Sequence, residues 1–356
     1  MKVVVAMSGG VDSSVTAALL KEEGYEVIGV TMELWPSPEL ADEAERFGGC
    51  CGLGAAEAKR VAYRLGIPHY AMNFEAVFAQ KVIADFCREY SVGRTPNPCI
   101  RCNQYVKFGA LLRKAKGLGA DFVATGHYAR IEHDTRSGSY LLKRGIDLKK
   151  DQSYVLYMMT QEQLRDTLMP LGHFAKEQVR KMARDMNLPV ADKAESQDIC
   201  FIPDENYSRF FKQYLPGAAK PGPIVDKRGN TLGAHRGILF YTIGQRRGLG
   251  ISAPEPSYVV AIDAKDNTIV VGSKKDTYRD ELIATEVNWI AIEQPRQPIK
   301  AKAKVRYLHP GAEATVTPLA DDKVEVKFEE PQMAITPGQA VVFYNGDSVI
   351  GGGTIG

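Results

Sequence analysis

Two segments of this 356-residue chain combine residue types and spacings that can do chemistry. The first, Ser8-Gly9-Gly10-Val11-Asp12-Ser13-Ser14, directly follows the valine-rich run Lys2–Ala6. The second, Cys99-Ile100-Arg101-Cys102, directly follows the diproline segment Arg94–Pro98. The residues of the first segment point to phosphate binding, and those of the second to thiol chemistry.

The glycine pair predicts a phosphate-binding loop between a strand and a helix. Adjacent glycines let the backbone approach a ligand closely, and a helix start offers unpaired N–H groups and a partial positive charge. The hydroxyls of Ser8, Ser13 and Ser14 add donors. A carboxylate at Asp12 would repel phosphate unless a divalent cation lay between them, so we expect Mg²⁺ there. The alternative is a glycine turn in which Ser13 or Asp12 caps the helix, but the composition of the whole loop favours phosphate.

The Cys-x-x-Cys motif predicts a reactive thiol or, alternatively, half of a zinc site. A thiolate at a helix start and beside Arg101 gains electrostatic stabilisation, which lowers its pKa. Zinc would need two more ligands, and the sequence has no second motif of this spacing. Cys50-Cys51 could supply them only by folding back. Cys200, between Ile199 and Phe201, is on residues alone typical of a buried core cysteine.

Composition indicates a globular protein of two or three domains. The chain is 44% hydrophobic and 25% charged, and its net charge is +2. No apolar run is as long as a membrane span, and the six cysteines are too sparse for a disulfide scaffold. Since Met1-Lys2-Val3 enters a strand at once, we expect no signal or transit peptide. We therefore expect a cytoplasmic protein with no membrane partner. The basic segments 101–116 and 227–250 are either phosphate-tracking patches or solvated surface.

Apolar periodicity predicts an α/β fold with a doubly wound parallel sheet, the architecture of a PP-loop domain, over residues 1–202. Strands are expected at 2–6, 25–32, 67–72 and 121–125, and helices at 15–24, 55–65, 74–90, 108–116 and 175–187. The segment Arg94–Cys99 is expected to be a loop. Ligands bind at the carboxyl ends of parallel strands, so the glycine loop, Met32 and Gly126-His127 are expected to share one crevice.

The C-terminal half predicts a different architecture. Residues 203–280 form a Gly-rich central module, and short strands over 281–356, with a hairpin turn at Asn345-Gly346, predict a small β-barrel. In the strand Ile299–Leu308 the four cations alternate with apolar residues, which would place Lys300, Lys302, Lys304 and Arg306 on one face. Such a face either follows a nucleic-acid backbone or simply faces water.

Six segments together resemble the tRNA-specific 2-thiouridylases (the MnmA/TrmU family) of the PP-loop ATP pyrophosphatase superfamily. They are Ser8–Ser14, Arg94–Asn103, Thr125–Arg130, Lys150–Tyr154, Ser196–Phe201 and Tyr241–Leu249, in family order across nearly the whole chain. The resemblance implies an enzyme that adenylates the wobble uridine of tRNA at O2 with ATP and Mg²⁺ and then replaces that oxygen with sulfur. It also implies a sulfur-donor protein as partner.

The resemblance implies roles residue by residue. ATP would be bound by Ala6, Met7, Ser8, Gly9, Gly10, Val11, Asp12, Ser13, Met32 and Gly126. The target base would face Asn97, Pro98 and Cys99, and tRNA would contact His127, Lys150, Asp151, Gln152, Arg306, Tyr307 and Gln339. Cys102 would be the nucleophile, and Cys200 would carry persulfide sulfur and then form a disulfide with Cys102.

Cys99 departs from the family pattern, because well-known members have an aspartate there, proposed as a general acid or base. Three thiolates at Cys99, Cys102 and Cys200 could instead ligate an iron-sulfur cluster with one open iron site. A Cys-x-x-Cys disulfide is another option. Two other functions compete: an adenylating synthase like argininosuccinate synthetase, which needs no cysteines, and a non-catalytic tRNA-binding protein with a structural metal.

Overall fold

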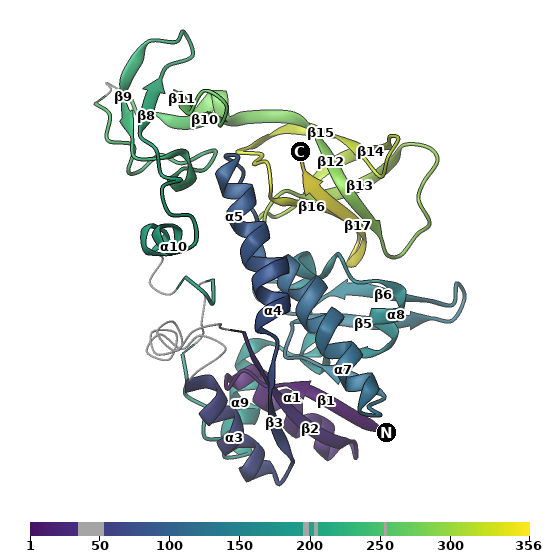
Figure 1. Ribbon diagram of the computed structural model, residues 1–356. Helices are drawn as coiled ribbons and strands as arrows, with labels where there is room; N and C mark the ends of the chain where they lie inside the picture. The colour runs from purple at the N-terminus through teal and green to yellow at the C-terminus, as the bar shows by residue number, and fades with distance from the viewer. Residues whose placement is uncertain (35–52, 195–198, 203–205, 253–254) are drawn as a thin grey trace. The chain divides into compact units, whose positions relative to one another are not determined.

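A computed structural model describes residues 1–34, 53–194, 199–202, 206–252 and 255–356 (Figure 1). Cys50-Cys51 and Ser196–Asp198, which entered the zinc and family arguments, lie outside the described residues. The chain divides into two compact units. The first contains residues 1–82, 99–205 and 347–350, and the second contains residues 83–98, 206–346 and 351–356.

A five-stranded parallel sheet forms the centre of the first unit. Its order is β3-β2-β1-β4-β7, with all neighbours parallel, and its strands are β1 (Lys2–Ala6), β2 (Glu26–Glu33), β3 (His69–Asn73), β4 (Phe122–Ala124) and β7 (Thr167–Leu168). Val3, Val4 and Val5 are all buried, as expected for a central parallel strand covered on both faces. The predicted parallel α/β sheet is confirmed.

Helices cover this sheet and build its core. Val15 of α1 (Val11–Glu22), Val61 of α3 (Leu53–Leu65) and Val179 of α9 (Lys176–Asp185) belong to one buried cluster with Val3 and Val5. The shorter helical segments are α4 (Glu75–Phe78), η1 (Ala79–Ile83), η3 (Ser153–Leu156), α8 (Gln161–Arg165) and η4 (Pro170–His173). Among the described helices, none is long and apolar enough to cross a membrane.

The helix that carries the Cys-x-x-Cys motif begins earlier than predicted. The expected loop Arg94–Cys99 and helix 108–116 were wrong at their bounds, since α6 (Pro98–Arg101) continues through η2 (Cys102–Leu111) and α7 (Leu112–Gly117). Proline suits the first helical position because it has no N–H to leave unpaired. The segment η2 is a π-helix, a form that is rare and frequent at functional sites.

A β-hairpin in the first unit was not predicted. Strands β5 (Ala129–Asp134) and β6 (Ser139–Arg144) pair antiparallel. Arg130 fixes the pair, because its Nε donates to the Arg144 carbonyl at 2.8 Å and its Nη2 donates to Asp347 at 2.6 Å. Charged residues in both strands obscure the alternation of apolar residues that would have marked them.

The second unit contains an aromatic cluster and a small sheet. Phe86 of α5 (Ala84–Ser91) lies 5.5 Å from Phe210 and 6.1 Å from Phe211 of α10 (Tyr207–Tyr214), measured between ring centroids. A four-stranded sheet follows in the order β10-β11-β8-β9, with strands β8 (Gly222–Val225), β9 (Thr231–His235), β10 (Tyr258–Asp263) and β11 (Thr268–Gly272). The short helices η6 (Ile238–Phe240) and η7 (Lys274–Thr277) flank it in sequence.

Six strands then form the predicted C-terminal β-barrel, which is confirmed. Their order is β12-β15-β14-β13-β16-β17, and pairing of β12 with β17 closes the barrel. The strands are β12 (Tyr278–Trp289), β13 (Ile299–Lys304), β14 (Ala312–Pro318), β15 (Val324–Met333), β16 (Ala340–Asn345) and β17 (Ser348–Ile355). Val316, Val326 and Phe343 are buried in it.

The predicted face of four cations is wrong in two respects. Strand β13 ends at Lys304, so Arg306 lies beyond it, and Lys304 is itself buried. The exposed Lys300 and Lys302 have acidic partners on other strands of the barrel, Glu329 of β15 at 2.9 Å and Glu313 of β14 at 3.9 Å. The strand therefore does not present four free positive charges to a nucleic acid.

Candidate functional site

The glycine loop adopts the tight turn that its composition predicts. Gly9 has φ +71°, and a Cβ there would lie 2.2 Å from the carbonyl oxygen of Gly54 at the start of α3. Gly10 is the N-cap of α1, and within the described chain no side chain caps it. The N–H groups of the first helical turn are thus not engaged by a cap, and together with the helix dipole they form a site for an anion.

The serine hydroxyls of this loop stabilise its own backbone. Ser13 and Ser14 both donate through Oγ to the Gly10 carbonyl, at 3.2 and 2.8 Å, and the Ser8 N–H donates to Ser13 Oγ at 3.2 Å. Hydroxyl bonds of this local kind compete with other partners. In this conformation the hydroxyls shape the loop, and binding phosphate through them would require exchange of these bonds.

Asp12 lies in the first turn of α1 and is bound by two nearly buried donors. Lys176 Nζ lies 2.7 and 2.8 Å from its two carboxylate oxygens, and the Tyr128 hydroxyl donates to Oδ1 at 2.7 Å. The Lys176 side chain is 9% exposed and the Asp12 side chain 32% exposed, so water screens the pair in part, from the carboxylate side. The loop, which lacks a lysine of its own, thus acquires one from the first position of α9.

A second lysine approaches the same loop. Lys193 Nζ donates to the Gly9 carbonyl at 3.3 Å and pairs with Glu57 of α3. Two cations from outside the loop therefore lie at its glycine and aspartate positions. The sequence analysis missed both lysines and Tyr128, because no local motif marks a side chain that reaches the loop only through the fold.

Gly126 and Met32 follow strand ends, as predicted. A Cβ on Gly126 would lie 2.8 Å from the Asp12 carbonyl carbon and 2.9 Å from the Ser13 nitrogen, so this backbone packs directly against the first turn of α1. Met32 pairs in register with Met72 near the carboxyl end of β2 and is half-buried. The structure brings Gly126 to the loop, while the nucleotide contacts of both residues stay predictions.

The described cysteines are thiols with different environments. Cys99 is exposed, Cys102 is buried, Cys200 is intermediate, and Cys87 is a buried cysteine of α5. The disulfide between Cys102 and Cys200 that the resemblance implies is not formed in this structure. Among the described residues, no three Cys, His, Asp or Glu side chains gather in a group that could hold a metal ion.

Several residues predicted to contact tRNA make hydrogen bonds within the first unit. His127 is 8% exposed, and its Nδ1 is 2.7 Å from Thr125 Oγ1. Asp151 accepts from the backbone N–H groups of Gly145 and Ser153, and Gln152 Oε1 accepts from the Tyr128 N–H at 2.9 Å. Lys150 is half-buried. Contact of these residues with tRNA stays a prediction, and for His127 and Asp151 it would require exposure of a buried side chain.

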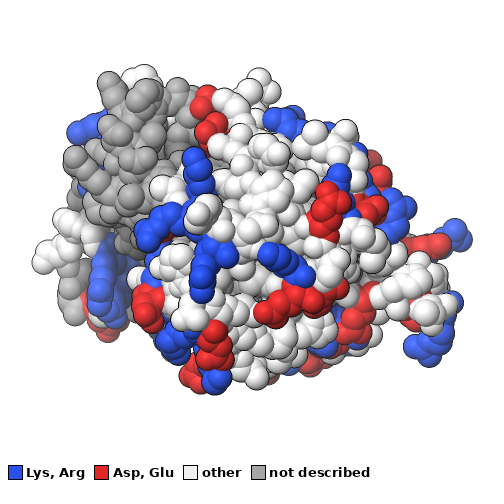
Figure 2. Space-filling model, turned by 90° about the horizontal axis from the view of Figure 1, so that it is seen from below, with Lys and Arg blue, Asp and Glu red and all other residues white. Residues whose placement is uncertain are grey.

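The remaining predicted residues lie in the second unit, apart from Cys99. Arg306 is exposed and donates to the Met333 carbonyl at 2.9 Å, beside the half-buried Tyr307. Gln339 donates through Nε2 to the Thr95 carbonyl at 2.8 Å. Asn97 is half-buried and Pro98 is buried. Figure 2 shows that on the described part of one face Lys and Arg lie next to Asp and Glu, in keeping with the net charge of +2.

Comparison with known proteins extends over the whole chain. Three family models match in sequence order: a tRNA methyl transferase HUP domain over residues 1–204, a tRNA methyl transferase PRC-barrel domain over 208–273, and an aminomethyltransferase beta-barrel domain over 279–355. A tRNA-specific 2-thiouridylase MnmA of Halothermothrix orenii is 53% identical over 99% of this chain and 98% of that relative. The chain belongs to the tRNA-specific 2-thiouridylase family.

Further relatives of that family agree. MnmA 1 of Caldanaerobacter subterraneus is 55% identical over 99% of this chain and 97% of its own. Among solved structures, a U34-tRNA thiolase NcsA of Methanococcus maripaludis with its [4Fe-4S] cluster is 17% identical over 61% of this chain and 67% of that chain. The TM-score of this structural match is 0.33.

Cysteine reactivity is the first test of these environments. Burial raises the pKa of Cys87 to about 11, whereas Cys99 is exposed. We expect iodoacetamide at pH 8 to alkylate Cys99 roughly two orders of magnitude faster than Cys87, because the thiolate is the nucleophile. Peptide mapping by mass spectrometry after timed quenching measures both rates, and denatured protein is the control. Equal rates in the folded protein would contradict the burial of Cys87.

The environment of His127 predicts a pH dependence of stability. Burial, and then the charge of Lys107, lower the pKa of His127 well below its usual value. Below about pH 6.5 the unfolded chain therefore binds a proton that the folded chain does not. The free energy of unfolding consequently decreases by up to about 1.4 kcal/mol for each unit by which the pH is lowered. Urea titrations from pH 7 to pH 5 should show a smaller loss for His127→Gln. The exposed His133→Gln is the matched control, and an unchanged slope for His127→Gln would contradict the prediction.

Proposed function

We propose that this protein is a tRNA 2-thiouridylase that converts the wobble uridine of tRNA to 2-thiouridine, with AMP and pyrophosphate as the other products. The observation that carries the proposal is identity above 50% to relatives of that name over nearly the full length of both chains. The anion-binding loop and the thiols of Cys102 and Cys200, all in the first unit, support it.

The first half-reaction is adenylation, and the charges around the loop suit it. The uridine O2 attacks the α-phosphorus of ATP, and the bond to the bridging oxygen breaks so that pyrophosphate leaves. Negative charge then develops on the leaving group, where backbone N–H groups and lysines stabilise it. In the structure Lys176 forms an ion pair with Asp12. When ATP binds, Lys176 is placed to exchange this carboxylate for a phosphate oxygen.

Magnesium fits the donor set at this loop. The Asp12 carboxylate offers a hard oxygen ligand of the kind Mg²⁺ prefers beside phosphates. The ion, when bound, supplies charge neutralisation between phosphate oxygens and the carboxylate. Asp12 would hold it, and Tyr128 keeps the carboxylate oriented through its hydrogen bond.

The second half-reaction transfers sulfur. A donor protein delivers sulfur to Cys200 as a persulfide, whose terminal sulfur attacks C2 of the adenylated uridine and expels AMP. The Cys102 thiolate then attacks the Cys200 sulfur, which leaves the terminal sulfur on C2 and forms a disulfide. A dithiol reductant must reduce this disulfide before the next turnover. The step requires the two Cα atoms to come within roughly 4.4–6.8 Å of each other.

Of the two sulfur routes that the sequence leaves open, we propose the persulfide route over an iron-sulfur cluster. Cys99, Cys102 and Cys200 do not gather into a metal-binding group among the described residues. The proposed route places Cys99 next to the target base, where other members have an aspartate.

We propose the cytoplasm as the compartment and three domains with bounds 1–202, 203–280 and 281–356.

Other functions account for fewer of these residues. An adenylating synthase like argininosuccinate synthetase would use the loop and leave the cysteines without a role. A non-catalytic tRNA-binding protein would leave the loop without a role, and the described residues contain no group of three Cys, His, Asp or Glu side chains for its structural metal. The methyl transferase named by the family models would likewise need no pyrophosphate site.

Substitution of Cys200 tests the function and its sulfur route. With unmodified tRNA, ATP, Mg²⁺ and a persulfide donor, we expect wild-type protein to form 2-thiouridine, measured by mass spectrometry of tRNA digests. Cys200→Ser should lower thiolation at least 100-fold while pyrophosphate release continues, because adenylation precedes sulfur transfer. Cys87→Ala, which changes a cysteine outside the reaction, is the control. A thiolating Cys200→Ser protein would refute the route, and an inactive wild type would refute the function.

Substitution of Lys176 tests the charge at the loop. Lys176→Gln should slow pyrophosphate release by roughly 10²-fold, since a group that stabilises developing charge is lost and Asp12 is left uncompensated. Lys181→Gln is the matched control, because Lys181 is exposed on the same helix and pairs only with Asp185 in the described contacts. Unchanged pyrophosphate release in a folded Lys176→Gln protein would contradict the role. If Lys176→Gln unfolds, Tyr128→Phe is the second variant. It removes the hydrogen bond from the Tyr128 hydroxyl to Asp12 and should slow pyrophosphate release several-fold.

A further inference from the structure

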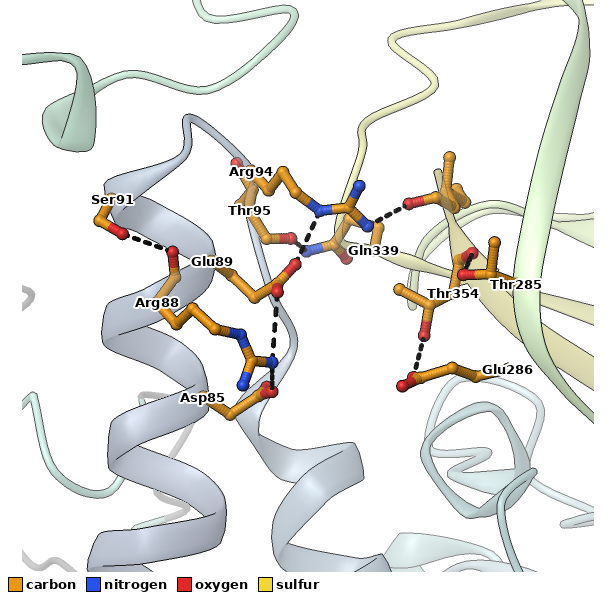
Figure 3. Close-up of polar contacts among 11 residues, drawn as sticks. Asp85, Arg88, Glu89, Ser91, Arg94, Thr95, Thr285, Glu286, Gln339 and Thr354 are labelled. Carbon is orange, nitrogen blue, oxygen red and sulfur yellow. Dashed lines mark hydrogen bonds and ion pairs between the residues drawn. The ribbon is translucent and has the colours of Figure 1, made fainter. Parts of the chain in front are cut away.

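Two side chains far apart in sequence link the loop after α5 to the barrel within the second unit (Figure 3). Arg94, just after α5, donates through Nε to Glu89 at 2.7 Å and through Nη2 to the Ile355 carbonyl of β17 at 2.8 Å. Gln339, just before β16, donates through Nε2 to the Thr95 carbonyl at 2.8 Å. The loop is thereby fastened both to its own helix and to the barrel.

The backbone of the loop is held in the same place. The Thr95 N–H donates to the Pro337 carbonyl at 2.8 Å, and the Thr95 hydroxyl donates to that of Thr242 at 3.1 Å. Gly338 has φ +90°, and a Cβ there would lie 2.9 Å from the Thr95 nitrogen. Since the barrel turn touches the loop backbone directly, Thr95 has little freedom to move within this unit.

Two prolines carry this constraint along the chain. Pro96 and Pro98 are both buried, and each fixes its own φ and restricts the residue before it. Asn97 lies between them, and helix α6 begins at Pro98, directly before Cys99. The conformation imposed at Thr95 therefore restricts the path of the backbone through Asn97 to Pro98, the residue that directly precedes Cys99.

We infer that Arg94 and Gln339 are positioning residues for thiolation, which hold the backbone of Asn97–Cys99 in the geometry that receives the uridine. The inference rests on the proposed function. It differs from the role that family resemblance implies for Gln339, a direct contact with tRNA. In the structure the Gln339 amide is committed to Thr95, and a positioning role follows from that bond.

Steady-state kinetics with matched variants separate the two roles. Gln339→Glu replaces the donating NH₂ with an acceptor of equal size, and Arg94→Lys keeps the charge but loses the fork that reaches two acceptors. Both should lower kcat for thiolation about tenfold at saturating tRNA and leave KM for tRNA and for ATP within twofold. Ser91→Ala and Thr354→Val are the controls, because each removes a polar contact drawn in Figure 3 that involves neither Arg94, Glu89, Thr95 nor Gln339. They should keep wild-type kcat.

An effect on KM in place of kcat overturns the inference. A raised KM for tRNA with unchanged kcat in Gln339→Glu would mean direct tRNA contact, and unchanged kinetics in both variants would mean that the bonds are dispensable. Alkylation of Cys99 provides a readout that needs no thiolase activity: its rate should change at least threefold in Gln339→Glu and Arg94→Lys and stay constant in the controls. A changed alkylation rate in a protein that does not thiolate tRNA would refute the proposed function and retain the mechanical link.

Discussion

A carboxylate in a loop built to receive a polyanion is tolerable only when positive charge lies beside it. Asp12 meets this condition through Lys176, which approaches from a helix more than 160 residues later in the chain. The requirement explains why α9 packs against α1 and why the buried Tyr128 lies directly before β5. The parallel sheet, with its strand ends on one edge, is the scaffold that allows three distant segments to meet at one carboxylate.

The sequence predicted the parts of the fold whose signals are local. The valine run Lys2–Ala6, the glycine pair and the C-terminal strands follow from periodicity and turn chemistry, and the structure confirms the parallel sheet and the barrel. The hairpin β5–β6 and strand β12 were missed, because charged residues on their exposed faces interrupt the alternation. The π-helical start of η2 has no known composition signal at all.

The site was predictable only in part for the same reason. Residues within a motif, such as Gly9 and Asp12, were identified by type and spacing. Lys176, Lys193 and Tyr128 act through long-range contacts, which no local pattern encodes. The alternation of lysines with apolar residues marked the strand correctly. It could not reveal that the barrel buries the side chain of Lys304. Motifs thus indicated where chemistry occurs, while charge balance around them required the fold.

The π-helix η2 begins at Cys102, the residue proposed as the nucleophile. Its backbone hydrogen bonds span five residues instead of four, so each turn holds more chain and less length than an α-helix. The Asn103 amide, which donates to the Val155 carbonyl at 2.9 Å, and Gln163, which donates to the Phe108 carbonyl, brace it from outside. A transition of this segment from π-helix to α-helix would lengthen it. It would also rotate Cys102 about the helix axis and so change the direction in which the buried Cys102 thiol points.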